Sequence, residues 1–148
     1  MKTKTFIHTG FLFIFLIVMA CEKDKDPPVY DIHGKWNWLK SYGGITGHDL
    51  QTPENTGTSK IWTFNENDTV IITENADTLT VTDYFLSRES SMLLHDTLDF
   101  VTIKYKYRIS ETEYLSIPMR YMIKTLTDTL VLAEDVYDGY GHEFVRRP

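Results

Sequence analysis

The amino-acid sequence predicts an all-β protein, an eight-stranded up-and-down antiparallel β-barrel that follows a short targeting segment. No stretch after Tyr30 repeats its apolar residues with helical periodicity, whereas several short runs alternate apolar and polar residues. Turn-forming residues separate these runs. The 148 residues suffice for one domain, and a single cysteine excludes a disulfide framework. Closure removes the unpaired edges of a sheet of short strands, so a barrel is the expected architecture.

The beginning of the chain has the composition of a signal peptide. Lys2 and Lys4 give a positive start, and residues 11–20 are ten apolar residues in succession. A membrane-spanning helix needs about 20 such residues, so this run is too short to span a bilayer but matches a signal-peptide core. We therefore divide the chain into three parts: a signal peptide (1–20), a tether (21–31) and a barrel domain (32–148).

The sequence Val18-Met19-Ala20-Cys21 resembles the lipobox of bacterial lipoproteins. In that family the signal peptide is cut before the cysteine, which carries a diacylglycerol and acyl chains such as palmitate. Cys21 is the only cysteine of the chain and stands where this motif requires it. The resemblance implies lipidation of Cys21 and an anchor in the outer membrane, on its periplasmic face or on the cell surface. An ordinary secretory signal with an incidental cysteine is the alternative.

Charge restricts the partners of the mature chain. Residues 22–28 are charged and end in two prolines, which is typical of a solvated tether. Removal of residues 1–20 takes away two lysines and leaves 13 basic and 21 acidic side chains, a net charge of −8. Such a domain lacks the basic footprint of non-specific nucleic-acid binding. We therefore expect a monomer with the membrane as partner through its anchor, and no nucleic acid.

Alternation and turns together define the expected strands. In residues 101–109, Val, Ile and Tyr share one face and Thr, Lys and Arg the other, as in a strand with one buried face. Pro118 cannot donate a ladder hydrogen bond, so its strand is bent, bulged or at an edge there. Residues 87–99 remain open, as either a short strand or a helical turn. The eight expected strands are 35–42, 59–64, 69–73, 78–86, 100–109, 114–125, 129–133 and 140–147.

Three pieces of the sequence resemble bacterial lipocalin-like lipoproteins. Gly34-Lys35-Trp36 resembles the Gly-x-Trp signature of lipocalins, residues 43–57 resemble the first long loop, and residues 130–147 resemble the last two strands. The resemblance implies an eight-stranded barrel. It also implies that Trp36 packs at the closed end beneath an arginine, for which Arg146 is the candidate. We therefore assign a structural role in barrel closure to Gly34, Trp36 and Arg146.

Alternation also predicts which side chains point into the barrel. Most of them are expected to fill the interior, whereas those near the open end could line a cavity. Trp38, Tyr105 and Tyr107 are the ligand-binding candidates, since each combines an apolar body with a polar tip. The predicted inward positions are Trp36, Trp38, Trp62, Phe64, Val70, Ile72, Leu79, Val81, Val101, Ile103, Tyr105, Tyr107, Met119, Tyr121, Ile123, Leu130 and Leu132.

Strand parity predicts an acidic mouth. In an up-and-down barrel, the first, third, fifth and seventh connections share one end, and here they contain no lysine or arginine. Clustered charge of one sign attracts ligands of the other, so a cationic ligand is favoured. The alternative is that these loops are acidic because the whole domain is. The acids are Asp49, Glu54, Glu74, Asp77, Glu111, Glu113, Glu134, Asp135 and Asp138.

Few motifs carry chemistry. The acids of residues 134–138 suggest calcium, but a hairpin turn at Asp138-Gly139 explains them more simply. The histidines show no metal-ligand spacing, and His142 is expected to be a hydrogen-bonded barrel residue. No metal or other cofactor and no enzyme activity are therefore predicted. Asp-Thr before an aliphatic residue resembles a bacterial O-glycosylation motif, although a turn followed by a strand explains it equally; the candidate threonines are Thr69, Thr78, Thr97 and Thr129.

These observations lead to one functional prediction and two alternatives. We expect a lipid-anchored envelope lipoprotein whose barrel binds a small, partly apolar ligand; an apolar or a cationic ligand is the candidate partner. The first alternative is a non-enzymatic interaction protein with a filled barrel, which contacts a protein or a glycan through its loops. The second is a barrel enzyme, which a buried pair of a carboxylate and a histidine in a cleft would favour.

Overall fold

A computed structural model describes residues 31–108 and 114–148. The expected signal peptide, Cys21 and nearly all of the expected tether therefore lie outside the described residues. The elements in chain order are β1 (Gly34–Gly43), β2 (Asp49–Gln51), α1 (Pro53–Thr56), β3 (Lys60–Phe64), β4 (Thr69–Glu74), β5 (Asp77–Ser90), β6 (Thr97–Arg108), β7 (Tyr114–Leu126), β8 (Thr129–Glu134) and β9 (Tyr140–Arg147).

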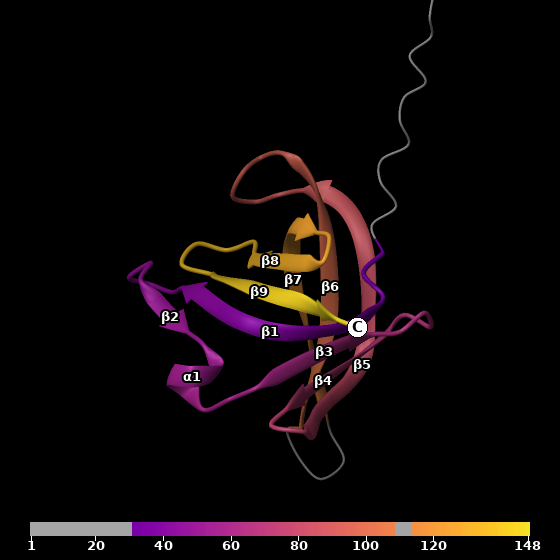
Figure 1. The fold of residues 1–148 in the computed structure, drawn as a ribbon. Coiled ribbons are helices and arrows are strands. Elements are labelled where there is room, and N and C mark those ends of the chain that lie inside the picture. The colour runs from indigo at the N-terminus through magenta and orange to yellow at the C-terminus, as the bar shows by residue number, and fades with distance from the viewer. Residues whose placement is uncertain (1–30, 109–113) are drawn as a thin grey trace, which may run out of the picture.

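The strands form a closed antiparallel barrel, which confirms the predicted fold class. Neighbours in the sheet follow chain order from β3 to β9, and pairing of β1 with both β3 and β9 closes the ring of eight strands (Figure 1). The short β2 pairs with the end of β1 as an addition to this ring. The architecture is consistent with a lipocalin-like fold.

Residues 87–99, for which the sequence left two possibilities, lengthen the strands predicted at 78–86 and 100–109. β5 continues to Ser90 and pairs there with Thr97 of β6. Between them, the Ser91 N–H donates to the Asp96 carbonyl over 2.8 Å and closes a tight connection. The segment therefore adds no strand, and the predicted alternation of the connections between the two ends is preserved.

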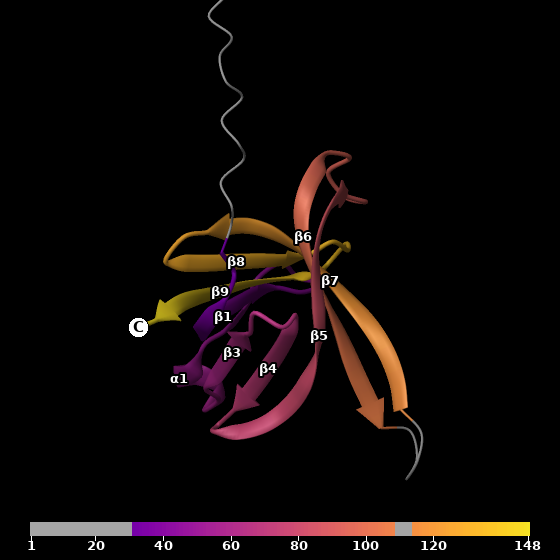
Figure 2. The same cartoon turned by 90° about the vertical axis from the view of Figure 1, so that its right-hand side faces the viewer.

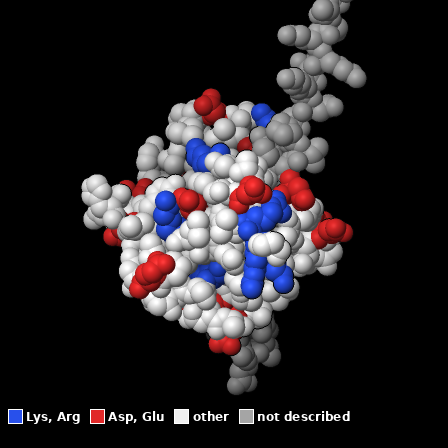
Figure 3. All heavy atoms as spheres, in the orientation of Figure 1, with Lys and Arg blue, Asp and Glu red and all other residues white. Residues whose placement is uncertain are grey.

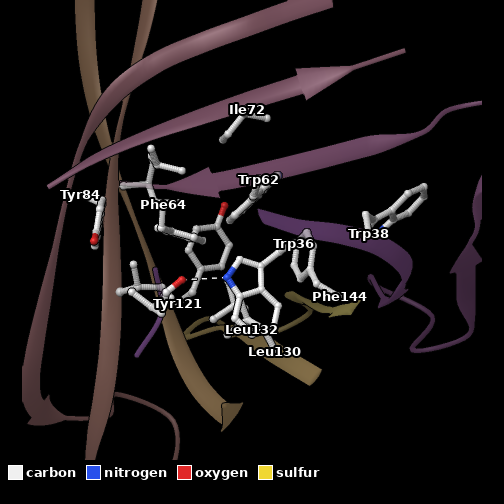
Figure 4. Close-up of a cluster of buried hydrophobic side chains, with 14 residues drawn as sticks. Trp36, Trp38, Trp62, Phe64, Ile72, Tyr84, Tyr121, Leu130, Leu132 and Phe144 are labelled. Atoms are coloured by element: carbon white, nitrogen blue, oxygen red, sulfur yellow. Dashed lines mark hydrogen bonds between the residues drawn. The ribbon is translucent and has the colours of Figure 1, made fainter. Parts of the chain in front are cut away.

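The core consists of large side chains that point into the barrel. Trp62 packs against Phe144 with ring centroids 4.9 Å apart, and Phe64 meets Tyr84 edge-on at 5.0 Å (Figure 4). The fully buried Trp36 donates its indole N–H to the Ile32 carbonyl over 2.8 Å. Burying aromatic rings of this size contributes a large share of the hydrophobic stabilisation of a small barrel.

The predicted inward positions in β5 are wrong. Leu79 and Val81 are 61% and 56% exposed and point outward, whereas Thr82 and Tyr84 are buried. A bulge shifts the register between β4 and β5 at this place, because Thr73 pairs with Thr78 but its neighbour Ile72 pairs with Thr80. Packing of the Tyr84 ring on Phe64 outweighs the burial of two aliphatic side chains and reverses the phase of the strand.

The β6–β7 hairpin extends beyond the neighbouring strands (Figure 2). Its far part, Lys104–Arg108 with Tyr114–Pro118, is paired within the hairpin, while β7 pairs with β8 only from Tyr121 onward. Pro118 lies opposite Lys104 in this part, on a strand whose other edge is open, so the edge position is the one of the three expected possibilities that the structure shows. We call this part of the hairpin the β6–β7 arm.

Candidate functional site

A cavity opens at the end of the barrel where β1 and β8 end and β3 and β9 begin. Its volume is about 270 Å³. We call it the mouth cavity. Its lining comes from all parts of the ring except β4 and β5, with one residue from β2: Trp38, Ser41, Gln51, Lys60, Trp62, Tyr105, Tyr121, Glu134, Tyr140, His142 and Phe144.

Aromatic rings form the floor of the mouth cavity. Trp38, Trp62 and Phe144 are each buried and continue the core upward to this end. Further out, the Tyr105 and Tyr121 hydroxyl oxygens lie 3.5 Å apart. An apolar floor with a few polar groups above it is the usual composition of a small-molecule site.

A chain of hydrogen bonds orients His142 in the wall. The Trp38 indole N–H donates to Ser41 Oγ over 2.9 Å, and this oxygen lies 2.8 Å from His142 Nδ1. An indole nitrogen only donates, so Ser41 Oγ accepts this bond, and the serine oxygen can still either donate to Nδ1 or accept from it. His142 Nε2 is buried and has no hydrogen-bond partner among the described residues.

Two charged side chains flank His142. Glu134 Oε1 lies 3.8 Å from His142 Nε2, while Glu134 Oε2 accepts the Tyr140 backbone N–H over 3.0 Å. Lys60 Nζ lies 3.7 Å from Glu74 and 5.1 Å from the centre of the Trp38 ring. Burial lowers the pKa of His142 below its ordinary value of 6.5, with Lys60 acting in the same direction and Glu134 against it. The imidazole is therefore neutral at pH 7.

The structure places two of the three ligand-binding candidates in the mouth cavity. Trp38 and Tyr105 line it. The side chain of Tyr107 lies outside the described residues, and its backbone pairs with Leu115 in the β6–β7 arm. Sequence reasoning did not single out Ser41 or Lys60, because neither stands in a recognisable motif.

The three residues assigned to barrel closure lie together at the opposite end. The Arg146 guanidinium lies 4.3 Å from the centre of the Trp36 ring. It also donates to the His33 and Asp31 carbonyls over 2.7 and 2.8 Å. Gly34 adopts φ +117°, and a Cβ atom there would come within 3.1 Å of Arg146 Nη1. These contacts join the start of the described chain to the last strand.

The expected acidic mouth does not form as a single cluster. Asp135 is 1% exposed and is bound by Arg120, away from the cavity. Lys60, which begins a strand just after an acidic loop, lines the cavity beside Glu134. Counting loop residues alone missed this lysine. Glu111 and Glu113 lie outside the described residues, and Figure 3 shows basic and acidic side chains interspersed on one face of the domain.

Asp135 instead forms a buried junction between two loops and β7. Its carboxylate accepts the Ser91 hydroxyl over 2.7 Å, the Met92 N–H over 3.0 Å and the Arg120 guanidinium. Burial by itself raises the pKa of Asp135, but the hydrogen bonds together outweigh it and leave the pKa below its ordinary 3.8. Arg120 also lies 4.5 Å from the centre of the Phe100 ring. The carboxylate is thus occupied by protein donors and unavailable for calcium.

Within 31–108 and 114–148, no three histidine, cysteine, aspartate or glutamate side chains are arranged to hold a metal ion. The four candidate glycosylation threonines stand at the first or second position of a strand, Thr78 and Thr97 exposed, Thr69 and Thr129 half-buried. This placement suits both a modification site and the turn-to-strand explanation.

Ser41, His142 and Glu134 include the residue types of a hydrolytic triad, but their arrangement favours binding. Ser41 is 5% exposed, and its oxygen already accepts the Trp38 N–H. A nucleophile needs an oxygen that a substrate can reach. All three side chains instead contribute to the lining of the mouth cavity.

Comparison of the chain with protein families, with curated proteins and with solved structures finds no match. Among the described residues, every helix falls short of the length and apolarity needed to cross a membrane.

Proposed function

We propose that this chain is a lipid-anchored envelope lipoprotein whose barrel binds a small, partly apolar ligand in the mouth cavity. The observation that carries the binding proposal is the cavity itself, with its aromatic floor and its row of hydrogen-bonding groups. The lipobox-like sequence at Cys21 supports the anchor. The proposal involves no catalytic step and no cofactor.

Native mass spectrometry of the protein purified from its own host tests the binding proposal. A co-purified small molecule is expected, and it should be absent from a variant in which Gln51→Trp places a bulky ring in the lining. Leu50→Trp is the matched control, because Leu50 is adjacent but 55% exposed and outside the lining. A wild-type mass without any adduct, together with no binding of added apolar probes, would contradict the proposal.

The anchor has its own test. The mature protein should partition into the detergent phase and label with radioactive palmitate, and Cys21→Ser should abolish both because it removes the acylated thiol. Wild-type protein that stays in the aqueous phase without label would contradict the anchor and leave the binding proposal intact.

Exposed side chains around the mouth favour the alternative, an envelope interaction protein. Ile45 in the loop after β1 and Tyr137 in the loop between β8 and β9 are 88% and 83% exposed. Large exposed apolar residues on loops are typical of recognition surfaces. If Ile45→Ser and Tyr137→Ser abolish cross-linking to an envelope protein while no small molecule co-purifies, this alternative replaces the first.

A further inference from the structure

We propose that the ligand of the mouth cavity is elongated, with a compact apolar head on the aromatic floor and an uncharged, unbranched apolar tail. The tail leaves the cavity along the inner face of the β6–β7 arm, which is the face that bears Tyr105, Ile117 and Leu115. This inference rests on the proposed function, since it names the class and the position of the ligand of the same cavity.

The first step is an apolar strip that continues from the mouth cavity onto the arm. Tyr105 lines the cavity and pairs across the hairpin with Ile117. Paired residues of an antiparallel ladder share one face, as do residues two apart in a strand, so Leu115 and Met119 lie on this face too. From Tyr121 in the cavity wall to Leu115 the strand advances six residues, about 20 Å, which is long enough for an extended chain.

The second step is that the strip is left exposed. β5 pairs with β6 only as far as Ile103, and β8 pairs with β7 only from Tyr121 (Figure 2). Beyond Lys104, neither side of the arm therefore has a neighbouring strand within the part of the chain that the structure describes. Leu115 and Ile117 are 47% and 38% exposed. Covering aliphatic side chains removes apolar surface from water, so a tail gains affinity with each methylene that it lays on the strip.

The third step distinguishes an apolar tail from a protein partner. A stable protein–protein interface takes about 20–30 residues from each side, whereas the strip adds two exposed aliphatic side chains to the cavity. The edges of the arm also disfavour the addition of a strand, because Pro118 offers no N–H on β7 and the exposed Lys104 stands on β6. The side chains of the strip carry no charge, so a charged tail would lose its hydration there without gaining a partner.

Three probes with one head and tails of different length test this inference: 2-naphthylmethanol, 4-(2-naphthyl)butan-1-ol and 7-(2-naphthyl)heptan-1-ol. Calorimetry uses the complete mature chain with Cys21→Ser, which lacks only the acyl groups, so that no probe partitions into lipid. We expect the affinity to rise about twofold per added methylene, because a one-sided strip buries roughly half of each methylene. Equal affinity for the three probes would overturn the inference while leaving the proposed function standing. Absence of all binding would overturn both.

A double variant tests where the tail lies. Leu115→Ser combined with Ile117→Ser makes the strip polar and should remove most of the roughly 60-fold advantage of the heptanol probe over 2-naphthylmethanol. Val81→Ser is the matched control, because Val81 is an exposed aliphatic residue that points outward from β5, and it should leave this advantage unchanged. An unchanged advantage in the folded double variant would refute the placement of the tail.

Methyl NMR supplies a measurement that needs no variant. In protein with carbon-13 in its isoleucine methyl groups, the heptanol probe should shift the Ile117 signal more than 2-naphthylmethanol does. An Ile117 signal that no probe shifts would overturn the inference. Sedimentation equilibrium tests a second copy of the chain as the occupant of the strip. A dimer that the double variant dissociates would overturn the inference as well, since protein would then cover this face.

Discussion

Replacing Asp135 by alanine should destabilise the domain strongly, although this residue lies in a loop. The change removes the acceptor for Ser91, Met92 and Leu93 and leaves the Arg120 guanidinium without its buried partner. Removing one member of a buried ion pair costs about 3–5 kcal/mol. Arg120 is 25% exposed and keeps a contact with Glu89, so the lower end of this range, about 3 kcal/mol, is expected.

Urea denaturation monitored by tryptophan fluorescence measures this loss, and the melting temperature should fall by roughly 10 °C. The Met92 and Leu93 amides should exchange their hydrogens faster in the variant than in the wild type. Because the pKa of Asp135 lies below 3.8, its contribution to stability is present above that pH and is lost in more acidic solution. The difference between variant and wild type should therefore shrink as the pH falls below 3.8.

Asp99→Ala is the control for Asp135→Ala. Asp99 pairs with Arg88 over 3.2 Å at the surface, where Arg88 is 61% exposed. A surface ion pair contributes about 0–1 kcal/mol. If the two substitutions cost the same free energy of unfolding, the reasoning from burial and from the three loop hydrogen bonds is wrong.

Three further predictions concern the closed end, the mouth and pH. Arg146→Ala should lower the free energy of unfolding by about 2 kcal/mol through loss of the cation–π contact and two hydrogen bonds, and an unchanged melting temperature would contradict this. Gly43→Ala should destabilise more than Gly47→Ala in thermal melts. Both have positive φ, but only at Gly43 would the new methyl group overlap the Gly139 carbonyl, so equal losses would argue against the contact. Burial lowers the pKa of His142, so the stability that the neutral imidazole contributes is present above pH 6.5 and is lost as the pH falls further. The wild type should therefore lose more free energy of unfolding between pH 7 and pH 5 than His142→Phe does. Parallel stability curves for the two proteins would disprove this.

Much of the fold could be predicted because β-structure leaves a local signature. The alternation in residues 101–109 places β6 within a few residues, since side chains of a half-buried strand face opposite sides in turn. Turns are also recognisable from a few neighbouring residues. The turn predicted at Asn75-Ala76 lies between β4 and β5, and both residues have the positive φ that a tight hairpin turn requires. The same local reasoning is wrong for Leu79 and Val81, where packing of Tyr84 on Phe64 decides which face is buried.

The candidate site could be predicted only in part. Trp38 and Tyr105 were identified because alternation and amphipathic chemistry are visible in a single strand. The contact between Ser41 and His142 joins residues 101 positions apart, and no local sequence pattern predicts it. The burial of Asp135 has the same origin, since its partner Ser91 is 44 positions away.

The sequence by itself determined most of the strand pattern and the antiparallel barrel, because these depend on periodicity within short stretches. Only the tertiary structure decided which polar groups meet: the neutral His142 facing Glu134 in the mouth cavity, and Asp135 enclosed by Arg120 and Ser91. Closing the ring brings β1 beside β9 and folds the loops over the wall. Hydrogen bonds and charge pairs act over a few ångströms, so their partners are determined by where the closed barrel places them.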